Sequence, residues 1–172
     1  MKLQQLSLFL ENRPGQLRAP CRALADAGID ILTLSLADTA QFCAAYGFAL
    51  DETANAIVVV GKSDPPVHVV CLVLADSRVD VNQTVRRRLG VRKASFASPD
   101  QTRALTGMEI GGVVPFGTST DLGFWIDHRV MERERVVIGG GSRDRKFLVP
   151  PATLLGHPRA EVVEGLALPP GQ

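Results

Sequence analysis

The chain has 172 residues, 45% of them hydrophobic, and a formal net charge of +1. This length suits one domain, or one domain with a small addition, and the apolar share is sufficient for a buried core. Because the net charge is close to zero, any attraction to nucleic acid must come from local patches. The longest apolar runs, residues 56–60 and 67–75, are far too short to span a bilayer. We therefore expect a cytoplasmic protein with no membrane partner.

The cysteines show no metal-binding pattern. Cys21, Cys43 and Cys71 are widely spaced, no two of them form a CxxC pair, and the three histidines have no ligand spacing to them. We expect buried free thiols, with no metal site and no cofactor.

The first half of the chain predicts alternating strands and helices. Residues 3–10 and 29–36 read as strands around a helix at 15–27, which begins after Pro14 and ends at Gly28. Asp38 or Thr39 can cap a further helix that ends at Gly47. The remaining expected elements of this part are a short helix at 51–54, an apolar strand pair at 56–60 and 67–75, and a helix at 81–89. Continuous apolar strands of this kind are typical of strands buried on both faces.

The second half adds short elements around glycine-rich loops. Ser98 and Gln101 form a capping-box pattern at the start of a helix that ends near Gly107. We expect strands at 94–96, 123–127, 135–139, 146–149 and 161–164, and a last helix from 150 to 155. Strands and short helices in mixed order indicate an α/β or α+β single domain with a mixed sheet.

Three segments carry a resemblance to a known family. They are Thr106–Gly117 (TGMEIGGVVPFG), Asp76–Asp80 (DSRVD) and Ile138–Arg143 (IGGGSR). In sequence, order and spacing they resemble the YbaK family of aminoacyl-tRNA deacylases, which is related to the editing insertion of prolyl-tRNA synthetase. The resemblance covers about residues 38–167 and implies a domain at 37–167, with 168–172 as a tail. It also implies a curved mixed β-sheet with flanking helices, hydrolysis of mischarged tRNA, and the aminoacylated 3′ end of tRNA as partner, with an aminoacyl-tRNA synthetase as a further partner.

The glycine-rich loop has suitable chemistry for such a site. A Gly111-Gly112 pair lets the backbone approach a ligand closely, and Pro115 stiffens the loop. Fixed N–H groups of this kind can bind an ester carbonyl and its developing oxyanion. The loop taken by itself would equally suit a tight turn between a helix and a strand. The resemblance implies catalytic positions at Asn55, Gly111 and Gly112, and substrate-binding positions at Arg78, Asp80, Val113, Pro115, Phe116, Gly117, Gly140, Gly141, Ser142, Arg143 and Lys146.

Asn55 departs from the family pattern. The resemblance implies a lysine at this position, and an asparagine amide can orient a carbonyl but carries no charge. Lys62 lies seven extended residues away, roughly 23 Å. Lys93 and Arg78 are other cations that a neighbouring element could bring to the site.

Two clusters of positive charge are candidate phosphate contacts. Residues 86–93 contain five cations, which suit either the acceptor stem of tRNA or a solvated helix face. Arg143, Arg145 and Lys146 follow the second glycine-rich loop, so we expect them to hold the 3′-terminal phosphates.

The start of the chain resembles a different family. Residues 1–42 are similar to the opening strand, loop, helix and strand of an ACT domain, although the second half of that module is missing. We expect residues 1–36 to form a β-α-β segment packed onto the main domain. Two alternatives to a deacylase remain: a non-catalytic tRNA- or nucleotide-binding module with the same fold, and an amino-acid-sensing regulator built on the ACT-like start.

Overall fold

The computed structural model describes residues 39, 43, 46–118, 121–142 and 145–169. All of them belong to one compact unit of the chain, Ser35–Gln172. The elements expected in residues 3–36, including the ACT-like segment, lie outside the described residues. Of the helix expected from Asp38 or Thr39, the described residues Thr39, Cys43 and Tyr46 are helical, and Gly47 follows with a φ of +72°.

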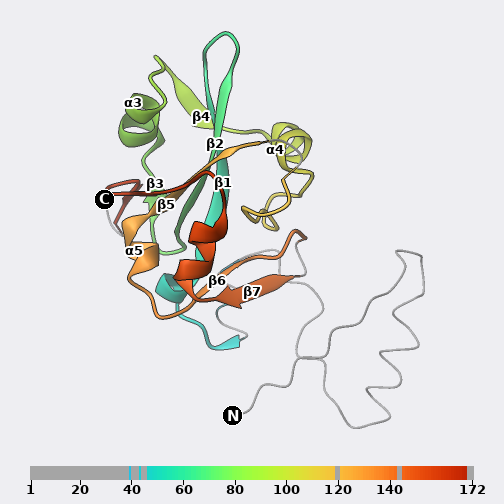
Figure 1. The fold of residues 1–172 in the computed structure, drawn as a ribbon, viewed down its shortest axis with the longest axis vertical. Coiled ribbons are helices and arrows are strands. Elements are labelled where there is room, and N and C mark those ends of the chain that lie inside the picture. Colours follow the sequence, from blue (N-terminus) through green and yellow to red (C-terminus); the bar gives the residue numbers. More distant parts are fainter. Residues whose placement is uncertain (1–38, 40–42, 44–45, 119–120, 143–144, 170–172) are drawn as a thin grey trace, which may run out of the picture. The chain divides into compact units, whose positions relative to one another are not determined.

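A five-stranded mixed sheet forms the centre of this unit, with the strand order β4-β1-β2-β5-β8 (Figure 1). Strand β1 pairs antiparallel with β2 and β4, whereas β5 lies parallel to β2 and β8. The bounds are β1 Ala54–Gly61, β2 Val67–Leu74, β4 Ala94–Phe96, β5 Gly123–Asp127 and β8 Ala160–Val163. All five were predicted to within two residues, and the mixed α/β class is confirmed.

Each face of the sheet is covered by its own apolar core, as the continuous apolar runs predicted. The first core contains Val58 from β1 and Val114 from the glycine-rich loop. The second core contains Val59 from β1 and Val85 from a helical turn. Cys71 is fully buried in the second core, and this burial raises the pKa of its thiol to about 12. The side chain therefore stays a neutral thiol that packs in the core. The expectation of buried free thiols is confirmed for Cys43 and Cys71.

Helix α4 packs against the first core and begins with the predicted capping box. The Ser98 hydroxyl accepts a hydrogen bond from the Gln101 amide, and the Gln101 side chain accepts one from the Ser98 amide. The helix spans Pro99–Thr106 and ends at Gly107, whose φ is +75°. Leu105 joins the first core from this helix.

The helical turns on the second face follow directly after β3. A single π-helical turn, η2, spans Val81–Val85 and continues into α3, Arg86–Arg88, so the helix expected at 81–89 is present. A further short helix, α5 (His128–Met131), was not predicted, because the sequence pattern placed His128 in a loop. It begins where the buried Asp127 carboxylate accepts a hydrogen bond from the Arg129 amide.

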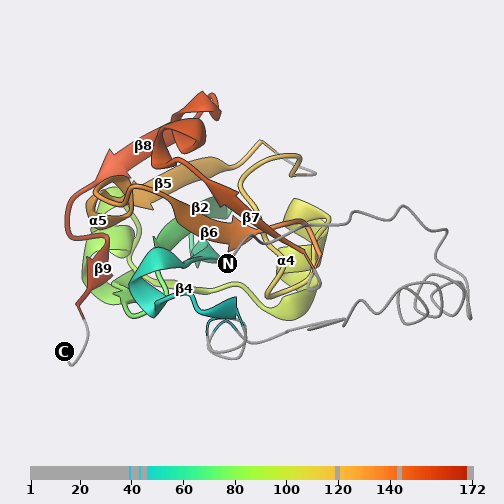
Figure 2. The ribbon, with the colours of Figure 1, turned by 90° about the horizontal axis from the view of Figure 1, so that it is seen from below.

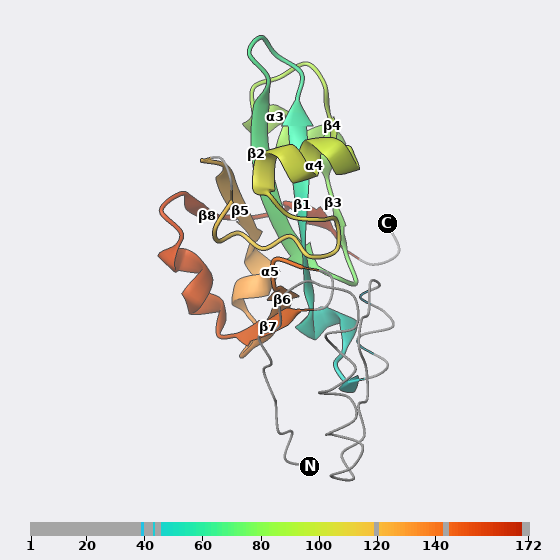
Figure 3. The same cartoon turned by 90° about the vertical axis from the view of Figure 1, so that its right-hand side faces the viewer.

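Two small antiparallel pairs complete the unit. The β6–β7 hairpin lies near the start of β1, at the end opposite the β1–β2 turn (Figures 1 and 3). The β3–β9 pair lies on the side of α5 and away from α4 (Figure 2); its strands were not predicted because two residues show no periodicity. The bounds are β6 Val136–Gly139, β7 Lys146–Val149, β3 Arg78–Val79 and β9 Ala167–Leu168, with 3-10 helices η1 Leu50–Glu52 and η3 Pro151–Gly156.

Candidate functional site

The two glycine-rich segments lie directly against each other. The Gly141 amide donates a hydrogen bond of 2.8 Å to the Gly112 carbonyl. A Cβ atom on Gly112 would lie 2.6 Å from the backbone carbon of Ser142, and one on Gly139 would lie 2.2 Å from the Val113 carbonyl oxygen. Such close backbone contact requires glycine on both sides. The fold therefore unites two segments that are about thirty residues apart in the chain.

Lys146 connects this pair of segments to the β6–β7 hairpin. It lies opposite Gly139 in the hairpin register. Its Nζ atom donates a hydrogen bond of 3.2 Å to the Gly111 carbonyl oxygen. Burial lowers the pKa of Lys146, and its electrostatic interaction with Cys43 opposes part of that decrease. A half-buried cation is thus fixed against the glycine-rich loop.

Asn55 lies in the same row of residues across three strands. Thr53, just before β1, forms a parallel bridge with Val137 of β6. Two residues further along each strand are Asn55 and Gly139, and side chains alternate along a strand, so both lie on the face of that bridge. Lys146 is the register partner of Gly139, which completes the row.

This row brings a cation close to the candidate site. Neighbouring strands lie about 4.8 Å apart, so the backbones of Asn55 and Lys146 are about 10 Å apart. Within the described part of the chain, Lys146 is therefore better placed than Lys62 or Lys93 to supply a positive charge beside Asn55.

The helical residues before β1 orient Asn55. The Thr39 hydroxyl donates a hydrogen bond of 2.9 Å to the Asn55 Oδ1 atom. Four residues later, Cys43 contacts the Thr53 hydroxyl at 3.3 Å, so one helical face meets both side chains of the strand. Because Oδ1 is occupied, the Nδ2 group supplies the hydrogen-bond donors that Asn55 can offer a ligand. Sequence reasoning considered Thr39 only as a helix cap and gave no signal for this contact.

The later residues of the glycine-rich loop mainly shape it. Val113 and Pro115 are buried, and Val113 belongs to the first core. The Phe116 ring is partly buried and lies 6.2 Å from the His157 ring, measured between centroids. Gly111 and Gly117 have φ values of +89° and +71°, which explains why glycine suits both positions.

The second glycine-rich segment contributes its backbone to this contact. Gly140 packs on Arg145, since a Cβ atom there would lie 2.6 Å from the Arg145 Cβ atom. Gly141 has a φ of +87°. Ser142 lies against Gly112 through its backbone. Arg143 lies outside the described residues, and its contact with phosphate stays a prediction.

The third motif packs against the second core, whereas the glycine-rich loop packs against the first. Arg78 is in β3 and is exposed. The Asp80 carboxylate caps η2 by accepting hydrogen bonds from the Gln83 and Thr84 amides. Val79 between them belongs to the second core, on the opposite face of the sheet from Val113. This motif has a structural explanation, and substrate contact by Arg78 or Asp80 stays a prediction.

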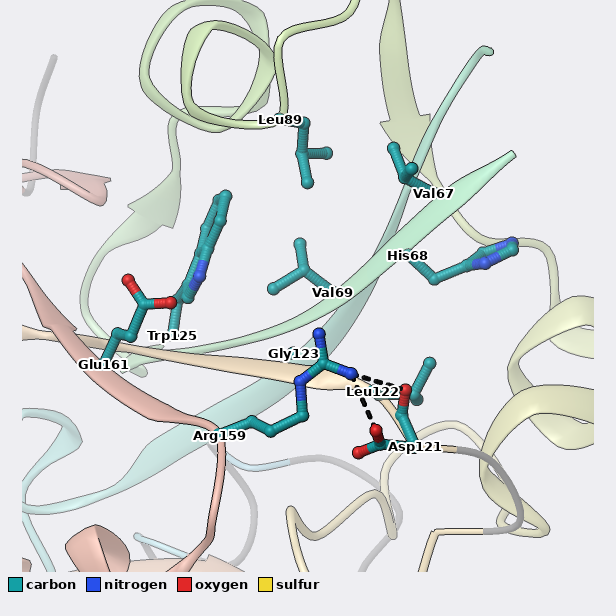
Figure 4. Close-up of a pocket in the computed structure, with 10 residues that line it drawn as sticks. All are labelled: Val67, His68, Val69, Leu89, Asp121, Leu122, Gly123, Trp125, Arg159 and Glu161. Carbon is teal, nitrogen blue, oxygen red and sulfur yellow. Dashed lines mark hydrogen bonds and ion pairs between the residues drawn. The ribbon is translucent and has the colours of Figure 1, made fainter. Parts of the chain in front are cut away.

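A cavity of about 390 Å³ lies on the second face of the sheet, away from the predicted site residues (Figure 4). An ion pair between Arg159 and Asp121 lies at its rim, at 2.8 Å. Arg88 pairs with Glu161 and also covers the Trp125 ring, 5.1 Å from its centroid. Trp125 is therefore a core residue covered by a cation rather than an open stacking surface. The cavity is lined by Val67, His68, Val69, Leu89, Asp121, Leu122, Gly123, Trp125, Arg159 and Glu161.

Two other kinds of feature are absent from the described residues. Within 39, 43, 46–118, 121–142 and 145–169, no three acidic, histidine or cysteine side chains are grouped closely enough to hold a metal ion. In the same part of the chain, no helix has both the length and the apolar character needed to cross a membrane.

Comparison of the chain with known proteins identifies its class. The sequence profile described as aminoacyl-tRNA editing domain matches residues 34–156. The chain belongs to this family, whose members act on aminoacyl-tRNA. The resemblance to YbaK-like domains is thereby confirmed.

Individual relatives agree with this assignment. The uncharacterized protein YwhH of Bacillus subtilis is 30% identical over 120 residues, which cover 70% of this chain and 74% of the relative. The multifunctional Ser/Thr-tRNA deacylase ProXp-y of Escherichia coli is 29% identical over 119 residues, covering 68% of this chain and 71% of the relative.

Solved structures with the same fold extend the comparison. A candidate trans-editing enzyme for prolyl tRNA synthetase matches with a TM-score of 0.67 and 25% identity, over 89% of this chain and 98% of its own. The hypothetical protein APE2540 matches with a TM-score of 0.71 over 87% of this chain and 99% of its own. Its identity of 19% supports the fold alone.

Proposed function

We propose that the protein is an aminoacyl-tRNA deacylase that hydrolyses the ester of mischarged tRNA. Membership of the editing-domain family supports this proposal. The observation that carries it is the row of Asn55, Gly139 and Lys146 beside the packed glycine-rich segments. It combines a hydrogen-bond donor, a fixed cation and closely approaching backbone, which ester hydrolysis needs at one place.

Each part of the row has a distinct role in this proposal. The Asn55 Nδ2 group orients the aminoacyl end, because Thr39 already occupies Oδ1. The Gly111–Gly117 loop presents backbone donors to the ester carbonyl. Lys146 supplies the positive charge that Asn55 lacks. Its ammonium has two hydrogens besides the one that binds Gly111, and these can donate to a ligand.

The reaction is an addition followed by elimination at the ester carbonyl. A water molecule, or a group of the substrate itself, adds to the carbonyl carbon, and the carbonyl oxygen takes up the negative charge. When the carbonyl re-forms, the carbon–oxygen bond to the terminal ribose breaks. Attack by water gives the amino acid and tRNA with a restored ribose hydroxyl. Lys146 favours the charged intermediate because its ammonium is held in a partly desolvated position.

The proposal is tested by measuring deacylation of a panel of mischarged tRNAs. The panel includes Ser-tRNA and Thr-tRNA, which the relative ProXp-y acts on according to its name. We expect turnover by the wild type and a loss of about 100-fold or more in Lys146→Met and in Asn55→Ala. Asn82→Ala is a matched control, because Asn82 is exposed on η2. Equal losses in control and test variants would contradict the assigned roles.

Asn55→Lys separates a deacylase from a binding module. If the wild type binds tRNA but hydrolyses none of the panel, whereas Asn55→Lys hydrolyses it, the domain has kept the binding function and lost turnover. Activity of the wild type that Asn55→Lys does not raise supports Lys146 as the working cation.

A further inference from the structure

The far end of the β1–β2 hairpin carries cations without counter-charges. Lys62 follows β1, and Arg92 and Lys93 precede β4. All three side chains are exposed. In the described part of the chain, no carboxylate forms an ion pair with any of them, whereas Arg88, Arg103, Arg129, Arg133 and Arg159 are all paired. We call these three residues the basic surface.

Two of these cations are held side by side by the backbone. The Lys62 amide donates a hydrogen bond of 2.8 Å to the Lys93 carbonyl, which continues the register of Gly61 with Ala94. Like charges directly opposite each other on antiparallel strands destabilise the pair. A lysine on an edge strand also prevents pairing with other chains, but Lys93 alone would achieve that. The repulsion is relieved when a polyanion binds.

The lysine pair lies on the same side of the sheet as the glycine-rich loop. Because side chains alternate along β1, Lys62 emerges on the face of Val58, whereas Asn55 emerges on the face of Val59. Val58 belongs to the first core together with Val114 of the loop, and Leu105 of α4 packs against that core. Figure 3 shows α4 across β1 and β2, with the hairpin end on one side of it and the loop on the other.

The distance from the candidate site limits the size of the ligand. Lys62 lies seven residues beyond Asn55 along β1, which corresponds to roughly 23 Å. An amino acid esterified to a single adenosine cannot span that distance, whereas an RNA with several phosphates can. Exposed cations arranged along a surface, without an enclosing cavity, are typical of contacts with a phosphate backbone.

We propose that the basic surface of Lys62, Arg92 and Lys93 binds the phosphate backbone of the tRNA acceptor stem while the aminoacylated 3′ end occupies the glycine-rich site. This inference rests on the proposed function and assigns the surface that holds the rest of the substrate. It separates the binding of the acceptor stem, near the β1–β2 turn, from the chemistry near the start of β1.

Binding of uncharged tRNA tests the surface independently of catalysis. Affinity is measured by fluorescence anisotropy between about 50 and 200 mM salt, for the wild type, Lys62→Gln, Lys93→Gln and the double variant. We expect each single variant to reduce the slope of log K against log salt by about 1, and the double variant by about 2. Arg135→Gln is the matched control, because Arg135 is an exposed cation just before β6, at the opposite end of β1. Wild-type slopes in the lysine variants, or an equal change in the control, would overturn the proposal.

Two further measurements distinguish this inference from the proposed function. We expect the double variant to deacylate mischarged tRNA at least tenfold more slowly at low substrate concentration, but to hydrolyse an aminoacyl-adenosine ester at the wild-type rate. If the double variant deacylates both substrates at wild-type rates, the proposed role of the basic surface is refuted, whereas the proposed deacylase activity is not. The wild type could instead hydrolyse neither substrate, while its salt-dependent binding of tRNA is lost in the double variant. That result would support the basic surface and refute the proposed deacylase activity.

Lys62→Glu separates a binding defect from a folding defect. It replaces the repulsive pair by an attractive one opposite Lys93, so its melting temperature should equal or exceed that of the wild type. Its affinity for tRNA should nevertheless fall below that of Lys62→Gln. A Lys62→Glu protein that binds tRNA as tightly as the wild type would refute the inference.

Discussion

Gly139→Ala perturbs the backbone contact on which the candidate site depends. In β6, a Cβ atom at this position would lie 2.2 Å from the Val113 carbonyl oxygen and 2.9 Å from the Gly112 carbonyl oxygen. Both oxygens belong to the backbone, so no side-chain rotation relieves the clash. The glycine-rich loop must retreat by roughly 1 Å or more to restore ordinary contact distances.

Such a displacement should affect catalysis more than folding. A 1 Å misplacement of catalytic groups costs on the order of 100-fold in rate, so we expect deacylation by Gly139→Ala to fall by about that factor. Overpacking typically lowers the free energy of unfolding by about 1–3 kcal/mol. The assays are deacylation of mischarged tRNA under single-turnover conditions and urea unfolding followed by circular dichroism.

Gly123→Ala provides the matched control for this variant. Gly123 is also a strand glycine, in β5, but its nearest contact to a Cβ atom would be the Val69 Cγ2 atom at 3.5 Å, an ordinary van der Waals distance. We expect wild-type activity and unchanged or slightly raised stability. If Gly139→Ala matched this control in both assays, the contact between the glycine-rich segments would not be as close as the structure indicates.

Three other perturbations test the site and the fold. Burial lowers the pKa of Lys146 below its ordinary 10.5, so the folded state binds fewer protons than the unfolded state between the two pKa values. The free energy of unfolding should therefore rise with pH across that window. Lys146→Met should remove this rise, as measured by urea unfolding between about pH 8 and pH 11. A rise that persists in the variant would show that another titrating group causes it. Ser98→Ala removes the cap of α4 and should lower the free energy of unfolding by about 1 kcal/mol, whereas no change would show that the capping bond contributes nothing. Asp127→Asn disrupts a fully buried carboxylate that binds Arg129 and the Ala167 amide, and we expect a loss of about 3–5 kcal/mol, with a loss below 1 kcal/mol contradicting this role.

The elements that the sequence predicted well are those with strong local signals. The Ser98 cap, the apolar β2 run and the β6 and β7 strands appear at or near their predicted bounds. The short helix α5 was missed because its start depends on the buried Asp127 carboxylate, whose partners Arg129 and Ala167 come from two different elements. Local periodicity contains no information about such a distant partner.

In the candidate site, too, the sequence predicted the local features and the structure supplied the contacts between distant residues. The glycine-rich loops could be identified from the sequence as places of close backbone approach, and the fold brings them together through Gly112 and Gly141. The contact of Lys146 with a terminal phosphate stays a prediction, and the structure adds that its Nζ atom binds the Gly111 carbonyl in a row with Asn55. Asp80 was grouped with the site from its motif, although its carboxylate caps η2.

By itself, the sequence determined which segments become the strands of the central sheet, where α4 begins and where the backbone can come close to another chain segment. These properties depend on neighbouring residues and on the conformational freedom of glycine and proline. The tertiary structure alone decided that Lys146 is the cation beside Asn55 and that Thr39 orients the amide. Those relations depend on register, because the bridge from Thr53 to Val137 of β6 and the pairing of β6 with β7 fix which distant residues share one face.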